Sequence, residues 1–318
     1  MAGTREIRRR IKSVKNTGKI TRAMEMISSV KMRKAAAGVL ALRPYAKSTW
    51  NVLRAVSRAR DVREKLPLFA ERPVGKELFV VVTSNRGLCG SFNTQMFRRL
   101  RAETEAIRSE HPEATLGFVS LGRKGDQGLR FLKGDIVASF PESIVNPSAS
   151  QIRSVARFVF DGFESGVWDH VSIAYTDFVS ALVQKPRVHR LLPFFEHDAE
   201  EQIAEMGDGN ERGAMSKEQG TMNGEQGSRG NLSAEYVVEP SPEAVLRSLL
   251  FRLVEMQILH AILESNASQE AARMTAMHSA TDAAKDMTES FTLLYNQLRQ
   301  AKVTQEIAEL SAGMAAVS

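Results

Sequence analysis

The sequence predicts an α/β protein in which a central α/β body is flanked by two long terminal helices. Helical hydrophobic patterns with few interruptions run through both ends of the chain, while short apolar runs alternate with helical stretches in the middle. Long helices of this kind need a partner for their apolar seams, and each terminal helix is the nearest partner of the other. The two helices are therefore expected to form an antiparallel coiled coil.

The N-terminal section, from residue 3 to about residue 60, has the hydrophobic period of one helix. Its apolar residues recur mostly at steps of three and four: Ile7, Ile11, Val14, Ile20, Met24 and Ile27. Gly18 is the one weak interior position, costing about 1 kcal/mol relative to alanine. We assign residues 1–60 to an N-terminal coiled-coil helix. Residues 61–77, which include Pro67 and Pro73, are assigned to a linker.

Residues 78–195 change to the pattern of an α/β body. Short apolar runs, as in buried strands, alternate with helical stretches at a spacing typical of layered α/β structures. The expected strands are 78–84, 116–122, 135–140, 170–178 and 188–195. The expected helices are 94–108, 125–133 and 148–166.

Residues 196–232 interrupt this pattern. They contain seven glycines, no aromatic residue, and nine acids against three bases. Such a segment buries too little apolar surface to offset the entropy of ordering, so we predict a flexible acidic insert. Two roles stay open for it: a solvated spacer, or an electrostatic brake that touches a basic surface of a partner.

The last section, 233–318, is predicted to be mostly one helix. Ser241 is a helix cap, and Pro242 suits the first helical position. A seam with a period of about 3.5 residues follows: Leu246, Leu249, Leu253, Met256, His260, Leu263, Ala267, Met274, Met277, Thr281, Ala284, Thr288 and Phe291. About 70 helical residues give a rod on the order of 100 Å, which exceeds one small domain.

The charge of the chain is unevenly distributed. The whole chain carries +6, yet residues 1–65 hold 18 Lys and Arg against four acids, so the remainder is acidic. A basic arm of this kind suits nucleic acid, anionic lipid or an acidic protein. No stretch reaches the ~18 consecutive apolar residues of a membrane helix, and the N-terminus lacks the apolar core of a secretory signal. The single cysteine, Cys89, excludes a disulfide within the chain and indicates a reducing compartment.

The sequence offers no recognisable catalytic, cofactor-binding or metal site. Residues 117–124 begin like a phosphate loop but lack its Lys-Ser/Thr pair. The turn RGLCG at 86–90 follows a strand without forming a dinucleotide fingerprint, which favours a tight strand–helix turn. No histidine is near Cys89 in the sequence, and the six histidines lack helical metal-ligand spacing. We therefore expect no catalysis, no cofactor and no metal in this chain.

Four blocks of sequence resemble the γ subunit of F-type ATP synthases, in the same order. They are NTGKITRAMEMISSVKMRKA at 16–35, SNRGLCGSFN at 84–93, ASQEAARMTAMHSATDAA at 267–284 and LLYNQLRQAKVTQEIAELSAG at 293–313. The resemblance spans about residues 3–315 without the insert. It implies a Rossmann-like α/β body, a coiled-coil shaft, and a foot segment that opens the section 233–318. The function it implies is that of a non-catalytic rotor, which couples ion flow through the membrane sector to nucleotide chemistry on the β subunits.

The resemblance also implies partner contacts. Residues matching family blocks near the β subunits are Lys19, Ile20, Thr21, Ala23, Met24, Met26, Arg299, Gln300, Thr304, Gln305 and Glu306. Those matching the foot segment near the c-ring are Tyr236, Glu239 and Pro240. The chain departs from the family at Gly18 and Val303, at Ser28-Ser29-Val30, and at His278, which leaves the contacts there open.

The implied partners are the α and β subunits of the hexameric head, the ε subunit and the c-ring. The implied location is the cytoplasmic face of the bacterial inner membrane, as a peripheral protein held through the c-ring. Two alternatives remain at this point: a basic coiled-coil protein that binds nucleic acid, and a nucleotide-dependent enzyme. The basic section has few aromatic residues, which disfavours the first alternative. The failed phosphate motifs disfavour the second.

Overall fold

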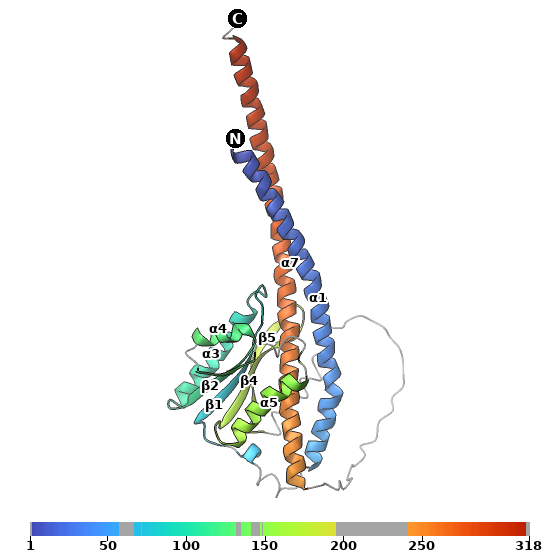
Figure 1. Cartoon of the computed structure of the whole chain (residues 1–318), viewed down its shortest axis with the longest axis vertical. Coiled ribbons are helices and arrows are strands. Elements are labelled where there is room, and N and C mark those ends of the chain that lie inside the picture. Colours follow the sequence, from blue (N-terminus) through green and yellow to red (C-terminus); the bar gives the residue numbers. More distant parts are fainter. Residues whose placement is uncertain are drawn as a thin grey trace, which may run out of the picture.

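The computed structural model describes residues 2–56, 67–70, 72–131, 135–140, 147, 149–194 and 241–315. The molecule consists of an α/β body beside two very long helices (Figure 1). The predicted insert 196–232, the foot residues Tyr236, Glu239 and Pro240, and part of the linker lie outside the described residues. The division of the chain into five parts therefore stays a proposal.

A five-stranded sheet forms the centre of the body, in the order β3-β2-β1-β4-β5. Its strands are β1 Lys76–Val82, β2 Thr115–Leu121, β3 Asp135–Ser139, β4 His170–Phe178 and β5 Gln184–Leu192. The first four are parallel, and β5 pairs antiparallel with β4. Parallel strands joined by helices with the first strand in the middle are the pattern of a doubly wound, Rossmann-like fold, which confirms the predicted fold class.

Helices cover both faces of this sheet. The helices of the body are α3 Phe92–Glu110, α4 Arg123–Phe131 and α5 Ala149–Glu164, with a short 3-10 helix η1 at Pro67–Phe69. One face packs Phe79 and Phe118 against Met96 and Leu100 of α3. The other face packs its valines and leucines against α5 and the long C-terminal helix. The core is thus continuous from the sheet into the base of the shaft.

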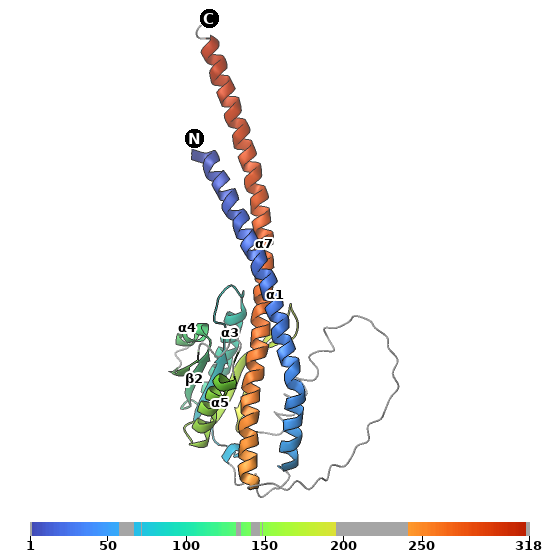
Figure 2. The same cartoon turned by 45° about the vertical axis from the view of Figure 1, so that its right-hand side comes forward.

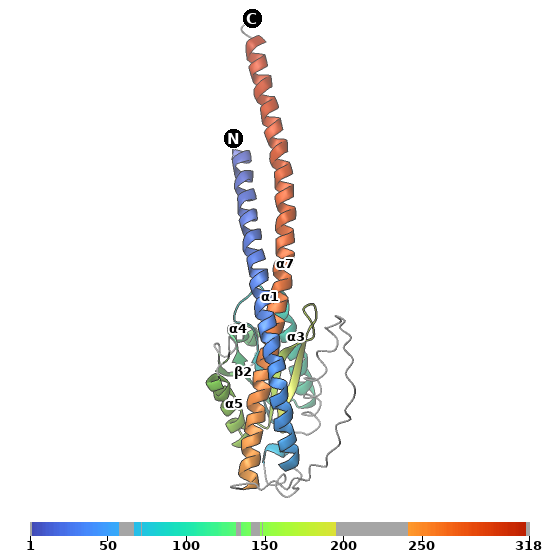
Figure 3. The same cartoon turned by 90° about the vertical axis from the view of Figure 1, so that its right-hand side faces the viewer.

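Two long helices form the shaft. They are α1 Ala2–Val56 and α7 Pro242–Ala315. Ser241 caps α7, since its Oγ accepts a hydrogen bond of 3.3 Å from the backbone N–H of Ala244. The helices run antiparallel, and α7 extends past the N-terminus of α1 in every view (Figure 1, Figure 2 and Figure 3). Along the body, α7 lies between the sheet and α1 (Figure 1).

The predicted strand at 188–195 is displaced in the structure. The strand β5 runs from Gln184 to Leu192 and includes Pro186. Proline cannot donate to a ladder, so the sequence favoured a later start. The displacement is possible because β5 lies at the edge of the sheet, where one side of the strand needs no partner.

Candidate partner-binding surface of the shaft

The seam of the shaft fixes which faces of the two helices remain outside. Thr21 Oγ1 lies 2.7 Å from Thr281 Oγ1, and His278 Nδ1 lies 3.0 Å from Glu25 Oε1. A Cβ added to Gly18 would lie 3.3 Å from Ala284 Cβ. Steps of three or four residues forward along α1 are thus matched by steps of three back along α7, which is the pattern of an antiparallel pair.

Small and polar residues make up much of this seam. Ile20 and Ile27 continue the apolar period that predicted the helix, yet they are 61% and 55% exposed. Thr21 and Ser28 are buried beside them. Two patterns with steps of three and four thus coexist on α1, and hydrophobic periodicity predicts the helix without telling which pattern faces α7.

The large apolar residues of α1 form a surface of their own. We call this surface the outer face of α1; its members are Ile20, Ala23, Met26, Ile27 and Val30, all exposed. Exposed Lys19, Arg22 and Lys31 lie among these positions in the sequence. A surface that is apolar and cationic suits a partner segment that carries both apolar side chains and carboxylates.

The residues of α1 expected at the contact divide between two environments. Lys19, Ile20, Ala23 and Met26 are exposed, and Met24 is half-buried. Thr21 is buried and faces α7 through its contact with Thr281. The structure therefore brings four of the six expected residues to the surface and turns Thr21 into the seam.

The tip of α7 is the second exposed region. Continuing the register of the seam places Ala2, the first described residue of α1, opposite Gln300, so later residues have no α1 turn beside them. The expected contact residues here are all exposed: Arg299, Gln300, Thr304, Gln305 and Glu306. Exposed apolar residues recur between and beyond them: Val303, Ile307, Leu310 and Met314. An apolar stripe on an unpaired helix indicates that a partner covers it.

A braced loop adjoins the shaft where it leaves the body. Residues 84–91 connect β1 to α3, and Asn93 holds the loop by accepting from the Ser84 N–H at 3.1 Å and donating to Ser84 Oγ at 2.8 Å. At its tip, Leu88 is 62% exposed and has a left-handed φ of 63°. This conformation is costly for leucine, and strained residues of this kind gather at functional sites.

Arg273 of α7 anchors this loop to the shaft. Its side chain is buried, forms an ion pair with Glu270, and donates to the Gly87 carbonyl at 3.5 Å. Sequence reasoning identified the turn at 86–90 but missed both Leu88 and Arg273. A pairing between residues so far apart in sequence gives no local signal, although the departure from a dinucleotide fingerprint was one hint that this loop has another use.

Within the described ranges, no group of three His, Cys, Asp or Glu side chains could hold a metal ion. Cys89 is buried, with Sγ 3.5 Å from Asn93 Nδ2, so it fills the turn as predicted. No described helix combines the length and apolarity needed to cross a membrane.

Comparison with known proteins connects this chain to a family. Residues 3–317 match the family model described as ATP synthase. The chain is 38% identical to the ATP synthase gamma chain of Roseiflexus castenholzii over 319 residues, covering 100% of this chain and 99% of that protein. It is 40% identical to the ATP synthase gamma chain of Moorella thermoacetica, with 98% of each chain covered.

Solved structures show the same fold. A chain of the central stalk and c-ring of Tetrahymena thermophila mitochondrial ATP synthase is similar with a TM-score of 0.57 and 24% identity, covering 82% of this chain and 99% of that one. A chain from the OSCP/F1/c-ring assembly of Euglena gracilis mitochondrial ATP synthase, in rotational state 3, gives a TM-score of 0.62 at 20% identity, covering 99% of this chain and 94% of that one.

Proposed function

The chain belongs to the ATP synthase gamma-chain family, and on that premise we propose that it is the central-stalk rotor of an ATP synthase. The shaft would stand inside the head formed by the α and β subunits, and the body would sit at the foot beside ε and the c-ring. This placement would hold the chain peripherally at the cytoplasmic face of a bacterial inner membrane. The relatives described above give no support to the nucleic-acid alternative.

The observation that supports this proposal best is the asymmetry of the shaft. One side of α1 carries the outer face, the other side is occupied by the seam, and the body packs against α7. An element with equal faces would interact equally with every surrounding subunit and could bias none of them. An element with one apolar, cationic face contacts only the subunit on that side. It therefore stabilises, in that subunit alone, the conformation that binds this face most tightly.

In this proposal the chain couples conformations and performs no nucleotide chemistry. Turning the shaft would present the outer face of α1, Leu88 and the tip of α7 to each β subunit in turn. Differential contact free energy in each position would shift that subunit among its nucleotide-binding states. We also propose, from the family resemblance, that Tyr236, Glu239 and Pro240 contact the c-ring.

Reconstitution tests the proposal. The full chain alone is expected to hydrolyse no ATP, whereas head subunits assembled with it should hydrolyse ATP while the chain rotates in one direction. Rotation can be measured on single molecules with a bead attached to the body. Hydrolysis by the purified chain at the rate of the assembled head, or hydrolysis by the assembly without rotation, would contradict the proposal.

A further inference from the structure

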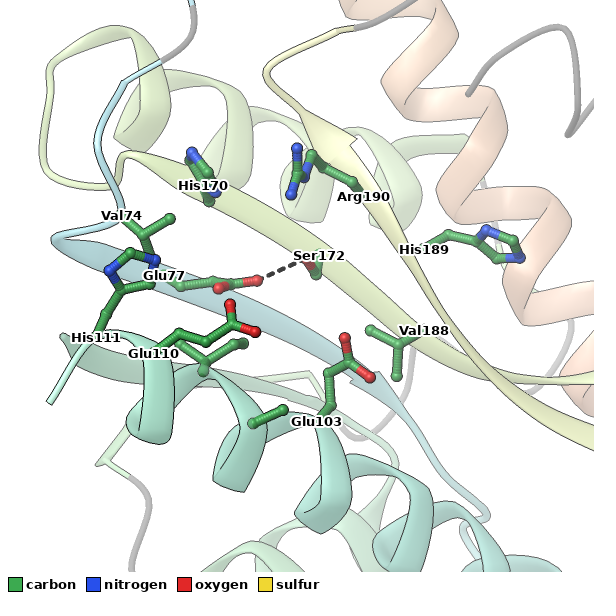
Figure 4. A pocket seen from close by; sticks show the side chains of 12 residues that line it. Val74, Glu77, Glu103, Glu110, His111, His170, Ser172, Val188, His189 and Arg190 are labelled. Carbon is green, nitrogen blue, oxygen red and sulfur yellow. Dashed lines mark hydrogen bonds between the residues drawn. The ribbon is translucent and has the colours of Figure 1, made fainter. Parts of the chain in front are cut away.

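A polar pocket opens on the body, away from the shaft surface described above. It lies between the C-terminal end of α3 and the strands β1, β4 and β5, with a volume of about 480 Å³ (Figure 4). Volumes of this order accommodate a small ligand or the end of a long side chain. The register places Glu77 beside His170 and Ser172 beside Arg190 at this end of the sheet.

Carboxylates converge on the pocket from two elements. Glu77 of β1 lies on its floor, while Glu103 and Glu110 reach toward it from α3 (Figure 4). The Glu77 side chain is only 6% exposed, and one of its oxygens accepts a hydrogen bond of 2.8 Å from Ser172 Oγ. A buried carboxylate needs more compensation than one hydrogen bond from a hydroxyl supplies.

The cationic and titratable groups around the pocket compensate Glu77 only in part. Burial raises the pKa of Glu77, and the charge of Glu103 raises it further, against the lowering effects of Ser172, Arg190 and His111. His170 Nε2 lies 3.0 Å from the Arg72 carbonyl. Because a carbonyl oxygen only accepts, this nitrogen carries the hydrogen and donates to Arg72 rather than to a glutamate. Burial is the largest of the effects on Glu77, so a cation placed beside it would stabilise its ionised form.

We propose that this pocket binds an organic cation, an ammonium or guanidinium group, with Glu77 as the buried ligand and Glu103 and Glu110 at the rim. Both cations offer several N–H donors to carboxylate oxygens. The lining holds three carboxylates, one arginine and three histidines, and Glu103 also pairs with Arg99 at 2.9 Å. With the histidines counted as neutral the lining stays net negative, which disfavours an anion. Two sources carry this chemistry: a free polyamine, and a lysine or arginine side chain of a partner subunit.

Titration of the full chain with spermidine tests the proposal. Isothermal titration at low ionic strength should show saturable binding of one equivalent. The Glu77→Gln variant should bind spermidine at least about ten-fold more weakly, since it loses a charge-assisted contact. The double variant Glu103→Gln/Glu110→Gln should show a similar loss, and it keeps the test valid if the buried substitution impairs folding.

A matched control lies on the same helix. Glu105 is exposed and pairs with Arg101 at 2.8 Å, so Glu105→Gln removes the same charge from α3 outside the pocket. Its affinity should stay within about two-fold of the unmodified chain. Absence of saturable binding, or an equal loss in the Glu105→Gln variant, would overturn the proposal, since general charge screening would then explain the data.

The assembled complex distinguishes the two sources. If a free polyamine is the ligand, spermidine should bind the assembled complex as well as the full chain alone. If a partner's side chain is the ligand, assembly should block spermidine, and substitution of Glu103 and Glu110 should weaken that partner's attachment about ten-fold. If assembly blocks spermidine binding but substitution of Glu103 and Glu110 does not weaken the partner's attachment, the partner source is contradicted. The partner would then cover the pocket without inserting a cationic side chain.

Discussion

Ile20 and Thr21 are neighbours in the sequence but have different surroundings. The hydroxyl of Thr21 meets Thr281 within the seam, whereas Ile20 lies on the outer face of α1 among solvent. The large apolar side chain is outside and the small polar one is inside. Such an inversion is unfavourable for an isolated chain and indicates that the outer face is covered when the protein is assembled.

The outer face leads to a prediction about binding. The double variant Ile20→Ser/Ile27→Ser should leave the stability of the chain within about 0.5 kcal/mol, because both side chains are exposed. Its affinity for the α/β head should fall about ten-fold or more, since two apolar side chains no longer become buried there. Equilibrium binding of the labelled full chain to the head measures this effect.

A control for this variant is available on the body. Leu182 is 82% exposed at the turn between β4 and β5, outside the outer face of α1. Leu182→Ser is expected to leave head binding unchanged. Equal weakening by both variants would show that loss of surface apolarity, rather than the outer face, determines binding.

Glu77 leads to a prediction about pH. Its pKa in the folded chain is raised above the ordinary value of 4.5, mainly by burial. The folded state therefore binds this proton more tightly than the unfolded state, and stability falls as pH rises from about 4.5 through the raised pKa. Glu77→Gln removes that loss, so it should stabilise the chain at pH 7 and stabilise it less near pH 4.5. Thermal unfolding at both pH values measures the difference; a larger gain at the lower pH would contradict the reasoning.

At the scale of elements, the sequence predicted what depends on local pattern. The strands β1 to β4 and the helices between them follow from the change of hydrophobic period, and Ser241-Pro242 marks the start of α7. The sequence did not show which face of α1 contacts α7. Gly18, Thr21 and Ser28 carry no hydrophobic signal, and their contacts depend on α7. The start of β5 was missed because Pro186 is tolerable only at an edge.

The close contact at Gly18 predicts how the shaft responds to bulk. A leucine at this position would need space where even a Cβ comes to 3.3 Å from Ala284 Cβ. Gly18→Leu should therefore destabilise the pairing of α1 with α7 by about 1–3 kcal/mol, as overpacked cores do. Thermal loss of helical circular dichroism reports this change. Ala23→Leu, on the outer face, should cost far less; equal costs would contradict the seam.

The unpaired tip of α7 leads to a further prediction. Truncation after Arg299 removes residues 300–318. The described residues beyond Gln300 have no α1 turn beside them, so the melting temperature should change little. Rotation of the assembled complex should nevertheless deliver less torque, because the exposed stripe that includes Ile307 and Leu310 is lost. A truncation after Ala280 removes the partners of Gly18 and Thr21 and should lower stability clearly. Unchanged torque after truncation at Arg299 would show that the tip of α7 has no part in the proposed mechanism.

At the scale of the whole molecule, α7 joins the α/β body to α1. Its lower half completes the core of the body, where Leu250 and Ile258 are fully buried, and its side chains hold the ends of β4. For example, Glu264 Oε2 accepts from the Phe178 N–H at 2.9 Å, and Ser268 Oγ donates to the Thr176 carbonyl at 3.1 Å. Torque applied to the body therefore reaches the shaft through packed and hydrogen-bonded contacts of one continuous helix.

The acidic section 196–232 leads to the last prediction, which concerns charge across the whole chain. The sequence joins a basic N-terminal helix, with 18 Lys and Arg in residues 1–65, to a section with nine acids against three bases. If that section only bridges the body and α7, deletion of residues 200–230 should leave ATP synthesis and hydrolysis unchanged, since loop-closure entropy depends weakly on loop length. If it touches a basic partner surface in one rotary direction, deletion should raise the rate in that direction at low salt. The gain should shrink above ~0.15 M salt, where exposed charges are screened. Rates measured in both directions at both salt concentrations decide between the two roles: a gain that persists at high salt excludes the electrostatic contact, and a gain confined to one direction at low salt excludes the spacer.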